Sequence, residues 1–370
     1  MLREDPRQSG CTRRRFAAVA AIGPVALGAA SGDGFEADRK RFLDPATDFE
    51  VIRLTNSSYS SYLPSSFCRP LSKKGVTLVY SSDRAGSLQA FRMEIKTGVS
   101  KQLTNAKTID PATLNILPDD RGMCYFDERT LFSLPFNTLK PHAVYEVPEG
   151  WDHAGGFTVS EDGLYAVVVE SRADGQSRLR LVPMMKGAAT TLAEATGLIE
   201  APQPRPKRAS VLYRLNGEMW LVHYDGQQNR KLKTAEGISG AAFWSPDGRG
   251  ALYLNIPNDK TKLNNIREIV VDTGTDSHVA NTSQFVNFAR NADASVFVGA
   301  SGSKASPHVL LLLRMTHREF TLCEHRASDP KMVAPVFSPT SQRIYFESDK
   351  HGKPAIYTMS VEKIVEPTET

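Results

Sequence analysis

The stretch Leu71–Thr104, LSKKGVTLVYSSDRAGSLQAFRMEIKTGVSKQLT, contains three short apolar runs separated by turn residues. The runs are Val76–Ser81, Leu88–Ile95 and Val99–Thr104, and clusters of Lys, Asp and Gly lie between them. Runs of about 4–8 residues rich in β-branched and aromatic side chains predict antiparallel strands joined by hairpins. With the apolar stretch Ser66–Pro70 ahead of them, they predict a four-stranded sheet. Such a sheet cannot bury both of its faces alone, so it requires neighbours.

Copies of this unit recur along the chain, each beginning with a turn that resembles Ser-Pro-Asp-Gly before an apolar strand. The clearest is Ser245-Pro246-Asp247-Gly248, which precedes GALYLN. Seven copies occur at intervals of about 41–47 residues, a period typical of the blades of a β-propeller. We therefore expect an all-β protein, a seven-bladed β-propeller of four-stranded antiparallel blades. The copies begin at Ser72, Leu117, Ser160, Pro204, Ser245, Asn291 and Ser338.

The N-terminal stretch Asp44–Thr55, DPATDFEVIRLT, resembles the end of a blade, since Val51–Thr55 echoes the strand Val99–Thr104. The last copy, Phe337–Val361, runs out after PAIYTMSV. We expect Val51–Thr55 to be the outer strand of the last blade, which would close the ring and remove two free strand edges. The alternative is a chance strand in an N-terminal arm.

The first residues predict an export signal. Thr12-Arg13-Arg14-Arg15-Phe16 precedes the mildly apolar segment AAVAAIGPVALGAA, a pattern typical of a twin-arginine signal. This segment is too short and too rich in Ala and Gly to span a membrane. We expect a signal at 1–30, a linker at 31–43, the propeller at 44–363 and a disordered tail at 364–370, in a periplasmic or secreted protein. The alternative is a disordered basic N-terminus.

Composition excludes several functional classes. The chain has 370 residues, 41% hydrophobic and 23% charged, which is ordinary for a globular protein. Its net charge of +4 comes mainly from residues 1–30, and the remainder carries 40 basic and 39 acidic side chains. We therefore expect no nucleic-acid partner and no membrane span after signal removal. Of the four cysteines, Cys11 lies in the expected signal. The remaining three, Cys68, Cys124 and Cys323, are odd in number and far apart, so they indicate no disulfide framework.

No catalytic motif stands out. The chain has no Gly-x-Ser-x-Gly elbow, no glycine-rich phosphate loop and no His-Glu-x-x-His or Cys-x-x-Cys motif. Any chemistry would have to come from side chains that meet at one mouth of the ring channel. Of the histidines, His325 ends a predicted strand and is a candidate site residue or a structural one. Trp151 could stack on a sugar ring or lie in the core, whereas Trp244 is expected to be core.

The chain resembles the oligogalacturonate lyase family, metal-dependent seven-bladed propellers that cleave pectin fragments by β-elimination. The resemblance covers most of the chain from Asp44 onward. It is carried by DPATDFEVIRLT (Asp44–Thr55), the blade Val76–Thr104, AVYEVPEGW (Ala143–Trp151), EMWLVHYDGQQNRKLK (Glu218–Lys233), FWSPDG (Phe243–Gly248), LCEH (Leu322–His325) and FSPTSQRIYFESDKHGKPAIY (Phe337–Tyr357).

The resemblance also implies a set of site positions. The family's elimination needs a base that removes the proton from carbon 5 of the uronate and a divalent metal that neutralises the adjacent carboxylate. The position of the base, a His, is Ala241 in this chain. Two metal-binding His positions are Met332 and Ala334, a third falls on Gln284, and a family Arg appears as Glu218. Ala and Met can serve neither as a general base nor as ligands of a hard metal.

Alternative functions remain open at this point. One is a lyase whose site is rebuilt from other residues, for example His325, Gln284 and Arg214, with Mn²⁺ or Ca²⁺ as cofactor. The other, which we favour, is a propeller without catalysis or cofactor that binds an acidic oligosaccharide or a periplasmic protein through the channel mouth. Trp151, Gln284 and His325 would then contact the saccharide. A third is a monomeric, Tol-type periplasmic propeller that binds protein partners.

Overall fold

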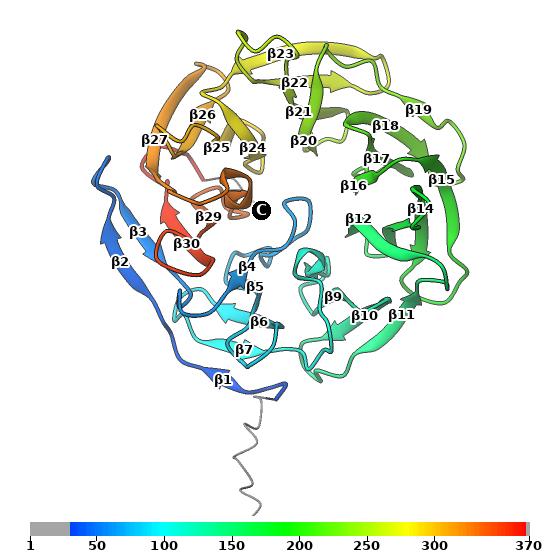
Figure 1. Ribbon diagram of the computed structural model, residues 1–370, viewed down its shortest axis with the longest axis horizontal. Coiled ribbons are helices and arrows are strands. Elements are labelled where there is room, and N and C mark those ends of the chain that lie inside the picture. Colours follow the sequence, from blue (N-terminus) through cyan, green and yellow to red (C-terminus); the bar gives the residue numbers. More distant parts are fainter. Residues whose placement is uncertain (1–29, 368–370) are drawn as a thin grey trace, which may run out of the picture.

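The computed structural model describes residues 30–367, which form seven antiparallel sheets arranged around a central axis (Figure 1). The predicted seven-bladed β-propeller is therefore confirmed. The predicted export signal lies outside the described residues, apart from Ala30. Within residues 30–367, the helical elements are two 3-10 turns, η1 (Pro111–Thr113) and η2 (Pro330–Val333). No helix among these residues is long and apolar enough to cross a bilayer.

The blades follow one another along the chain, and the strands of each are named from the innermost outward. Blade one is β4 (Ser61–Tyr62), β5 (Thr77–Ser82), β6 (Gln89–Glu94), β7 (Ser100–Gln102) and β1 (Gly34–Phe35). Blade two is β8 (Asn115–Ile116), β9 (Gly122–Asp127), β10 (Thr130–Pro135) and β11 (His142–Glu146). Blade three is β12 (Asp152–Val159), β13 (Tyr165–Ser171), β14 (Gln176–Pro183) and β15 (Thr190–Thr196). Blade four is β16 (Ile199–Pro204), β17 (Ser210–Leu215), β18 (Glu218–His223) and β19 (Arg230–Lys231).

The remaining blades complete the circle. Blade five is β20 (Ile238–Trp244), β21 (Gly250–Ile256), β22 (Asn265–Val270) and β23 (Thr275–Asn281). Blade six is β24 (Phe285–Arg290), β25 (Val296–Ser301), β26 (His308–Leu313) and β27 (Arg318–Glu324). Blade seven is β28 (Val336–Phe337), β29 (Arg343–Ser348), β30 (Ala355–Ser360), β3 (Glu50–Arg53) and β2 (Lys40–Leu43).

The recurring turn closes on itself through short polar side chains. In the copy at Ser245, the serine Oγ donates to Asp247 Oδ1 at 2.6 Å, and the same carboxylate accepts the N–H of Arg249. The N–H of Gly250, which opens the next strand, donates to Ser245 Oγ at 2.9 Å. Gly248 takes a φ of +68°, a conformation that glycine adopts without strain. These contacts are local, which is why the motif repeats in the sequence.

Neighbouring blades bury apolar side chains between them. One cluster joins Leu212 of β17 with Trp244 of β20 and Tyr253 of β21. Trp244 is 4% exposed, and its Nε1 donates to the carbonyl of Gln203 in blade four. The prediction that Trp244 is core is confirmed. Burial of this kind between adjacent sheets supplies most of the favourable free energy of folding.

An N-terminal strand lies in the last blade. β3 pairs antiparallel with β30, with Ile52 opposite Thr358 and Arg53 opposite Tyr357. Beyond the strand, the N–H of Leu54 donates to the carbonyl of Ile356 at 2.7 Å. Blade seven therefore combines strands from both ends of the described chain, as the blue β3 beside the red β30 shows (Figure 1).

Three sequence-based expectations differ from the structure. Residues 31–43, expected as a linker, contain β1 and β2, which add fifth strands to blades one and seven because β7 and β3 expose unpaired edges. Ser66–Pro70, expected as the inner strand of blade one, is a loop, and Ser61–Tyr62 takes that place. In the expected tail, Val365 is 3% exposed because it packs against the blade-seven cluster.

The two faces of the ring differ in their loops. Each innermost strand begins on one face and ends on the other at the turn resembling Ser-Pro-Asp-Gly. We call these the start face and the turn face. A six-residue strand such as β24 separates the two faces by roughly 20 Å.

Candidate functional site

A loop of blade one occupies part of the central channel. This channel loop, residues 63–70, leaves β4 and bends toward the axis of the ring (Figure 1). The N–H of Ser65 donates to the carbonyl of Ala112 in blade two, and Cys68 Sγ lies 3.2 Å from the carbonyl oxygen of Phe157 in blade three. The loop therefore bridges three blades and narrows the channel.

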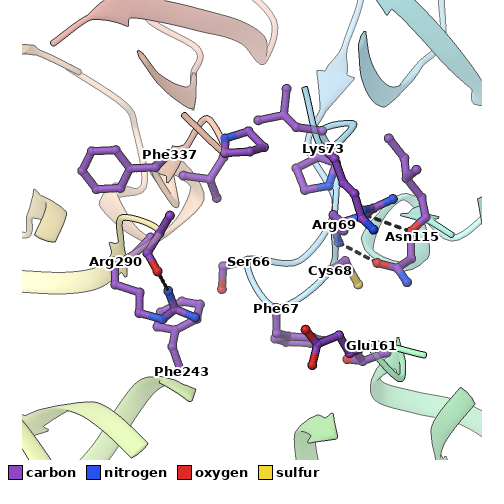
Figure 2. A pocket seen from close by; sticks show the side chains of 18 of the residues that line it. Ser66, Phe67, Cys68, Arg69, Lys73, Asn115, Glu161, Phe243, Arg290 and Phe337 are labelled. Atoms are coloured by element: carbon purple, nitrogen blue, oxygen red, sulfur yellow. Dashed lines mark hydrogen bonds between the residues drawn. The ribbon is translucent and has the colours of Figure 1, made fainter. Parts of the chain in front are cut away.

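A cavity of about 510 Å³ lies on the turn-face side of the channel loop. Its wall includes the rings of Phe67, Phe243 and Phe337, the ends of β12, β24 and β28, and the turns that follow them. Figure 2 shows Phe337 and Arg290 on one side of the cavity and Glu161 on the other, with Ser66 and Phe67 of the channel loop between them. The wall is mostly apolar, and its size is within the range of small-molecule sites.

The two arginines of this cavity are already engaged. Arg290 donates from Nε to the carbonyl of Trp244 at 2.6 Å and from Nη1 to the carbonyls of Asn291 and Ala292. Burial lowers the pKa of Arg290. The Nη2 of Arg69 donates to the carboxylate of Asp120 at 2.5 Å. Both guanidinium groups thus hold neighbouring segments together, and the cavity wall offers binding surface without a paired acid and base.

A histidine and an aspartate form an ion pair near the start face. His153 Nε2 lies 3.1 Å from Asp110 Oδ2, and its ring stacks on Phe126 with centroids 4.4 Å apart. Burial favours the neutral acid, but hydrogen bonds from His153 and the N–H of Ala112 outweigh it and lower the pKa of Asp110. Burial raises the pKa of the nearby Cys68 thiol, so this group is a poor nucleophile. The pair therefore fixes η1 against β12, and no activated nucleophile stands beside it in the described chain.

His325 is a structural residue. It is fully buried, its Nε2 lies 3.1 Å from the carbonyl of Ser301, and its Nδ1 accepts the N–H of Ala327 at 3.1 Å. Burial lowers the pKa of His325, against the effect of the hydrogen bond to Ser301. Both ring nitrogens are used inside the protein, so this side chain has neither a free lone pair for a metal nor access to a ligand.

The other predicted site residues lie on separate blades. Trp151 is half-buried, and its ring already contacts two guanidinium groups, those of Arg178 at 3.9 Å and Arg172 at 4.6 Å from the ring centroid. Arg214 pairs with Glu200 at 3.3 Å. Gln284 is exposed just before β24, with a φ of +63°. No described hydrogen bond or ion pair joins any of these residues to another or to His325.

The positions implied for a metal do not fit a divalent ion. Met332 and Ala334 lie in and just after η2 and contribute a thioether and a methyl group, and Gln284 contributes one amide oxygen. Residues 30–367 contain no group of three or more His, Cys, Asp or Glu side chains placed to hold a metal ion. Mn²⁺ prefers several carboxylate, carbonyl and imidazole ligands, and of the three implied positions only Gln284 offers such an atom in its side chain.

Comparison with known proteins finds similarity to oligogalacturonate lyases. The oligogalacturonate lyase family model matches residues 30–185. The oligogalacturonide lyase of Pectobacterium atrosepticum is 24% identical over 371 aligned positions, which cover 86% of this chain and 95% of the relative. The oligogalacturonate lyase of Dickeya dadantii is 22% identical with the same coverage. Over most of its length the chain is therefore similar to oligogalacturonate lyases.

Solved oligogalacturonate lyases have the same fold. The one from Vibrio parahaemolyticus superposes with a TM-score of 0.84 at 25% identity, covering 90% of this chain and 99% of that one. An oligogalacturonate lyase in complex with manganese superposes with a TM-score of 0.84 at 23% identity, covering 90% and 98%. The positions that the family resemblance implies for a site are Ala241, Gln284, Met332 and Ala334. They belong to the start-face half of the channel, whereas the described cavity opens toward the turn face.

Sequence reasoning missed the groups that shape the channel. The channel loop was expected to be a strand, and the pairing of Asp110 with His153 joins residues 43 positions apart. Asn287 was also missed: its Nδ2 donates to the carbonyl of Lys331 in η2, while its buried Oδ1 has no partner among the described residues. No local pattern marks any of these, because each depends on contacts between blades.

Proposed function

We propose that this protein binds a uronate-type oligosaccharide and that the metal-dependent elimination of its family is lost or altered in it. The observation that carries the proposal is the contrast between a preserved propeller and inert side chains at Ala241, Met332 and Ala334. The fold aligns over nine-tenths of the chain with solved oligogalacturonate lyases, which supports a shared scaffold. The family resemblance assigns the base and metal-ligand positions to these three residues.

The chemical reason lies in the transition state. Removing the proton beside a uronate carboxylate builds negative charge on a group that is already charged, so the reaction needs a base and a neutralising cation. Ala241 has no proton acceptor, and Met332 and Ala334 have no oxygen or nitrogen in their side chains. Binding of the saccharide needs neither group and can persist without them.

The alternative of a rebuilt lyase has less support. Its candidate residues are His325, which is buried with both nitrogens engaged, Gln284, which is exposed, and Arg214, which is paired with Glu200. These side chains share no contact. A Tol-type role, in which the propeller binds a periplasmic protein, stays a second possibility that no contact described above favours.

The experiment compares turnover with binding. Purified protein is incubated with trigalacturonate and Mn²⁺ while the ultraviolet absorbance of unsaturated uronate is recorded, and trigalacturonate binding is measured by calorimetry without metal. We expect binding and no increase in absorbance. An increase in absorbance that EDTA abolishes would restore the enzyme interpretation, and absence of binding would refute the saccharide proposal.

Export is a separate part of the proposal. The twin-arginine pattern at Thr12–Phe16 supports transport of the folded propeller out of the cytoplasm, where an oligosaccharide from outside the cell would meet it. Cell fractionation of the natural protein and of an Arg13→Lys/Arg14→Lys variant tests this. We expect the natural protein in the periplasmic or extracellular fraction as a monomer, and the variant in the cytoplasm.

A further inference from the structure

Blade five carries three asparagines at one level of its sheet. Asn255 of β21 lies directly opposite Asn265 of β22, and Asn265 lies directly opposite Asn281 of β23. Residues directly opposite each other in antiparallel strands point to the same face of a sheet. The three amides therefore form a row on one face of blade five, near its start-face end.

Two amide oxygens of this row lack a hydrogen-bond donor. Asn255 is 4% and Asn265 is 8% exposed, and the buried Oδ1 of each has no partner among the described residues. The orientation of Asn265 follows from its Nδ2, which lies 3.3 Å from the carbonyl of Leu263. Buried acceptors in folded proteins are normally paired, so two neighbouring exceptions indicate that something else supplies the donors.

Both oxygens belong to residues that line a cavity of about 410 Å³. The cavity lies between the segment that leads into β20, represented by Glu236, and the loop between β21 and β22, represented by Asp259 and Lys262. This volume exceeds that of a single water molecule by more than tenfold and suits a small organic ligand.

The rim of the cavity carries both signs of charge. Glu236 and Asp259 are acidic, and Lys262 and Arg267 are basic. Arg267 keeps its orientation through Asp276, to which its Nε donates at 3.0 Å. A ligand that fits must therefore reach the buried amide oxygens of Asn255 and Asn265 with hydrogen-bond donors and offer a negative group to the basic side of the rim.

We propose that this cavity is a binding site for one uronate unit of an acidic saccharide, outside the central channel. Vicinal hydroxyl groups would donate to Asn255 Oδ1 and Asn265 Oδ1, and the carboxylate would lie toward Lys262 and Arg267. The choice of a uronate rests on the proposed function, while the site itself rests on the unpaired amide oxygens and the basic rim.

A divalent cation is a weaker fit to the same oxygens. Ca²⁺ binds six to eight oxygen ligands, including amide oxygens and carboxylates. Here Lys262 and Arg267 would repel a divalent ion while Glu236 and Asp259 would attract it, so the rim gives a cation no net attraction. The combination of neutral acceptors with basic groups is suited to a hydroxylated anion.

The test measures binding of monomeric galacturonate, galactose and Ca²⁺ to the full propeller by calorimetry and ligand-observed magnetic resonance. We expect galacturonate to bind more tightly than galactose. Asn255→Leu should weaken galacturonate binding at least tenfold without lowering the unfolding temperature, because leucine leaves no unpaired amide oxygen. Asn265→Leu should weaken binding as much, although it also removes the donor to the carbonyl of Leu263. Lys262→Ala should weaken only galacturonate. Lys260 is a matched lysine of the same loop that does not line the cavity. Lys260→Ala should change the binding of neither galacturonate nor galactose.

The outcomes separate this inference from the proposed function. If trigalacturonate binds the natural protein and both Leu variants equally well, the site in blade five is refuted and the proposed function stands. If no saccharide binds, both fail. If Ca²⁺ binds with one ion per chain and the Leu variants lose it, the site holds a cation and the saccharide assignment is overturned.

Discussion

The side chain of Glu347 accepts a 2.5 Å hydrogen bond from the backbone N–H of Leu63, at the point where the channel loop leaves β4. Glu347 is 7% exposed and lies in β29 of blade seven, so the contact ties the last blade to the loop that narrows the channel. Burial raises the pKa of Glu347 to about 8, although the hydrogen bond opposes the shift. The carboxyl group is therefore neutral in the folded protein across most of the physiological range.

The first prediction concerns the pH dependence of stability. In the unfolded chain this carboxyl group ionises near its ordinary pKa of 4.5, whereas in the folded chain it keeps its proton up to about pH 8. Between these values the folded state binds one more proton, so its contribution to the free energy of unfolding falls as pH rises through that window. Glu347→Gln keeps an acceptor for Leu63 and removes the titration. We expect urea unfolding to show a flatter pH profile for this variant.

The control for this pH experiment is a glutamate that is not buried. Glu362 is exposed, and Glu362→Gln should leave the profile of the natural protein unchanged between about pH 5 and about pH 8. Parallel profiles for Glu347→Gln and the natural protein would show that Glu347 does not hold a proton in the folded state.

A second prediction concerns the contact between the channel loop and blade three. A Cβ added to Gly156 would lie 2.6 Å from Cζ of Phe67, and Gly156 has a φ of +105°. Gly156→Ala should therefore combine backbone strain with a clash, since overpacking typically costs about 1–3 kcal/mol. We expect a lower free energy of unfolding and faster hydrogen exchange in the channel loop, because Phe67 must move.

Gly175 provides the matched control for backbone strain. Its φ is +83°, and an added Cβ would have no atom within 4 Å. Gly175→Ala should carry the backbone cost alone and leave exchange in the channel loop unchanged. Equal effects of the two substitutions would mean that Phe67 does not pack against Gly156 in solution.

The fold could be predicted from the sequence because the turn that begins each copy of the repeated unit is stabilised by residues close together in the chain. The turn at Ser245 is closed by side chains within five residues of one another, so the same letters recur wherever the same turn is needed. Hydrophobic strands follow each turn, and their spacing gives the number of blades. The prediction for Ser66–Pro70 was wrong because this segment contacts Ala112 and Phe157 of other blades, and no neighbouring sequence records those contacts.

The candidate site was harder to predict for the same reason. Whether Trp151 offers a free ring depends on Arg172 and Arg178, which reach it from another part of blade three. Whether His325 can bind a ligand depends on Ser301, which lies in β25 of the same blade and whose carbonyl oxygen lies within hydrogen-bond distance of the imidazole ring. The unpaired oxygens of Asn255 and Asn265 are visible only once β21 and β22 are in register. Residue type and spacing do not carry this information.

A third prediction follows from the buried His325. Burial lowers the pKa of this imidazole from its ordinary value of 6.5, so below that pH the unfolded chain binds a proton that the folded chain does not. The free energy of unfolding should therefore fall as the solution is acidified below about pH 6.5. His325→Gln should lose about 1–3 kcal/mol at neutral pH, because buried hydrogen bonds to Ser301 and Ala327 are disturbed. The free energy of unfolding of this variant should also fall less steeply than that of the natural protein as the pH is lowered.

Chemical denaturation of both proteins across this range checks the prediction. His317, exposed in the loop after β26, serves as the control, and His317→Gln should leave the acid slope as it is in the natural protein. The prediction fails if His325→Gln keeps the full acid slope.

The last prediction tests whether the family's metal site can be restored. Met332 and Ala334 are two residues apart at η2, just ahead of β28, and occupy the positions that the family resemblance gives to metal-binding histidines. Met332→His/Ala334→His would supply two imidazole ligands beside Asn287, whose amide already contacts η2. We expect the double variant to bind Mn²⁺ at least tenfold more tightly than the natural protein, measured by the loss of the paramagnetic resonance signal of free Mn²⁺. Tenfold tighter binding corresponds to about 1.4 kcal/mol of added stability at saturating metal.

The control is an exposed pair with the same spacing in blade six, Lys304 and Ser306, and Lys304→His/Ser306→His should give no such gain in Mn²⁺ affinity. If the two double variants bind Mn²⁺ equally, Met332 and Ala334 do not occupy the family's ligand positions, and the argument that the elimination chemistry is lost would need another basis.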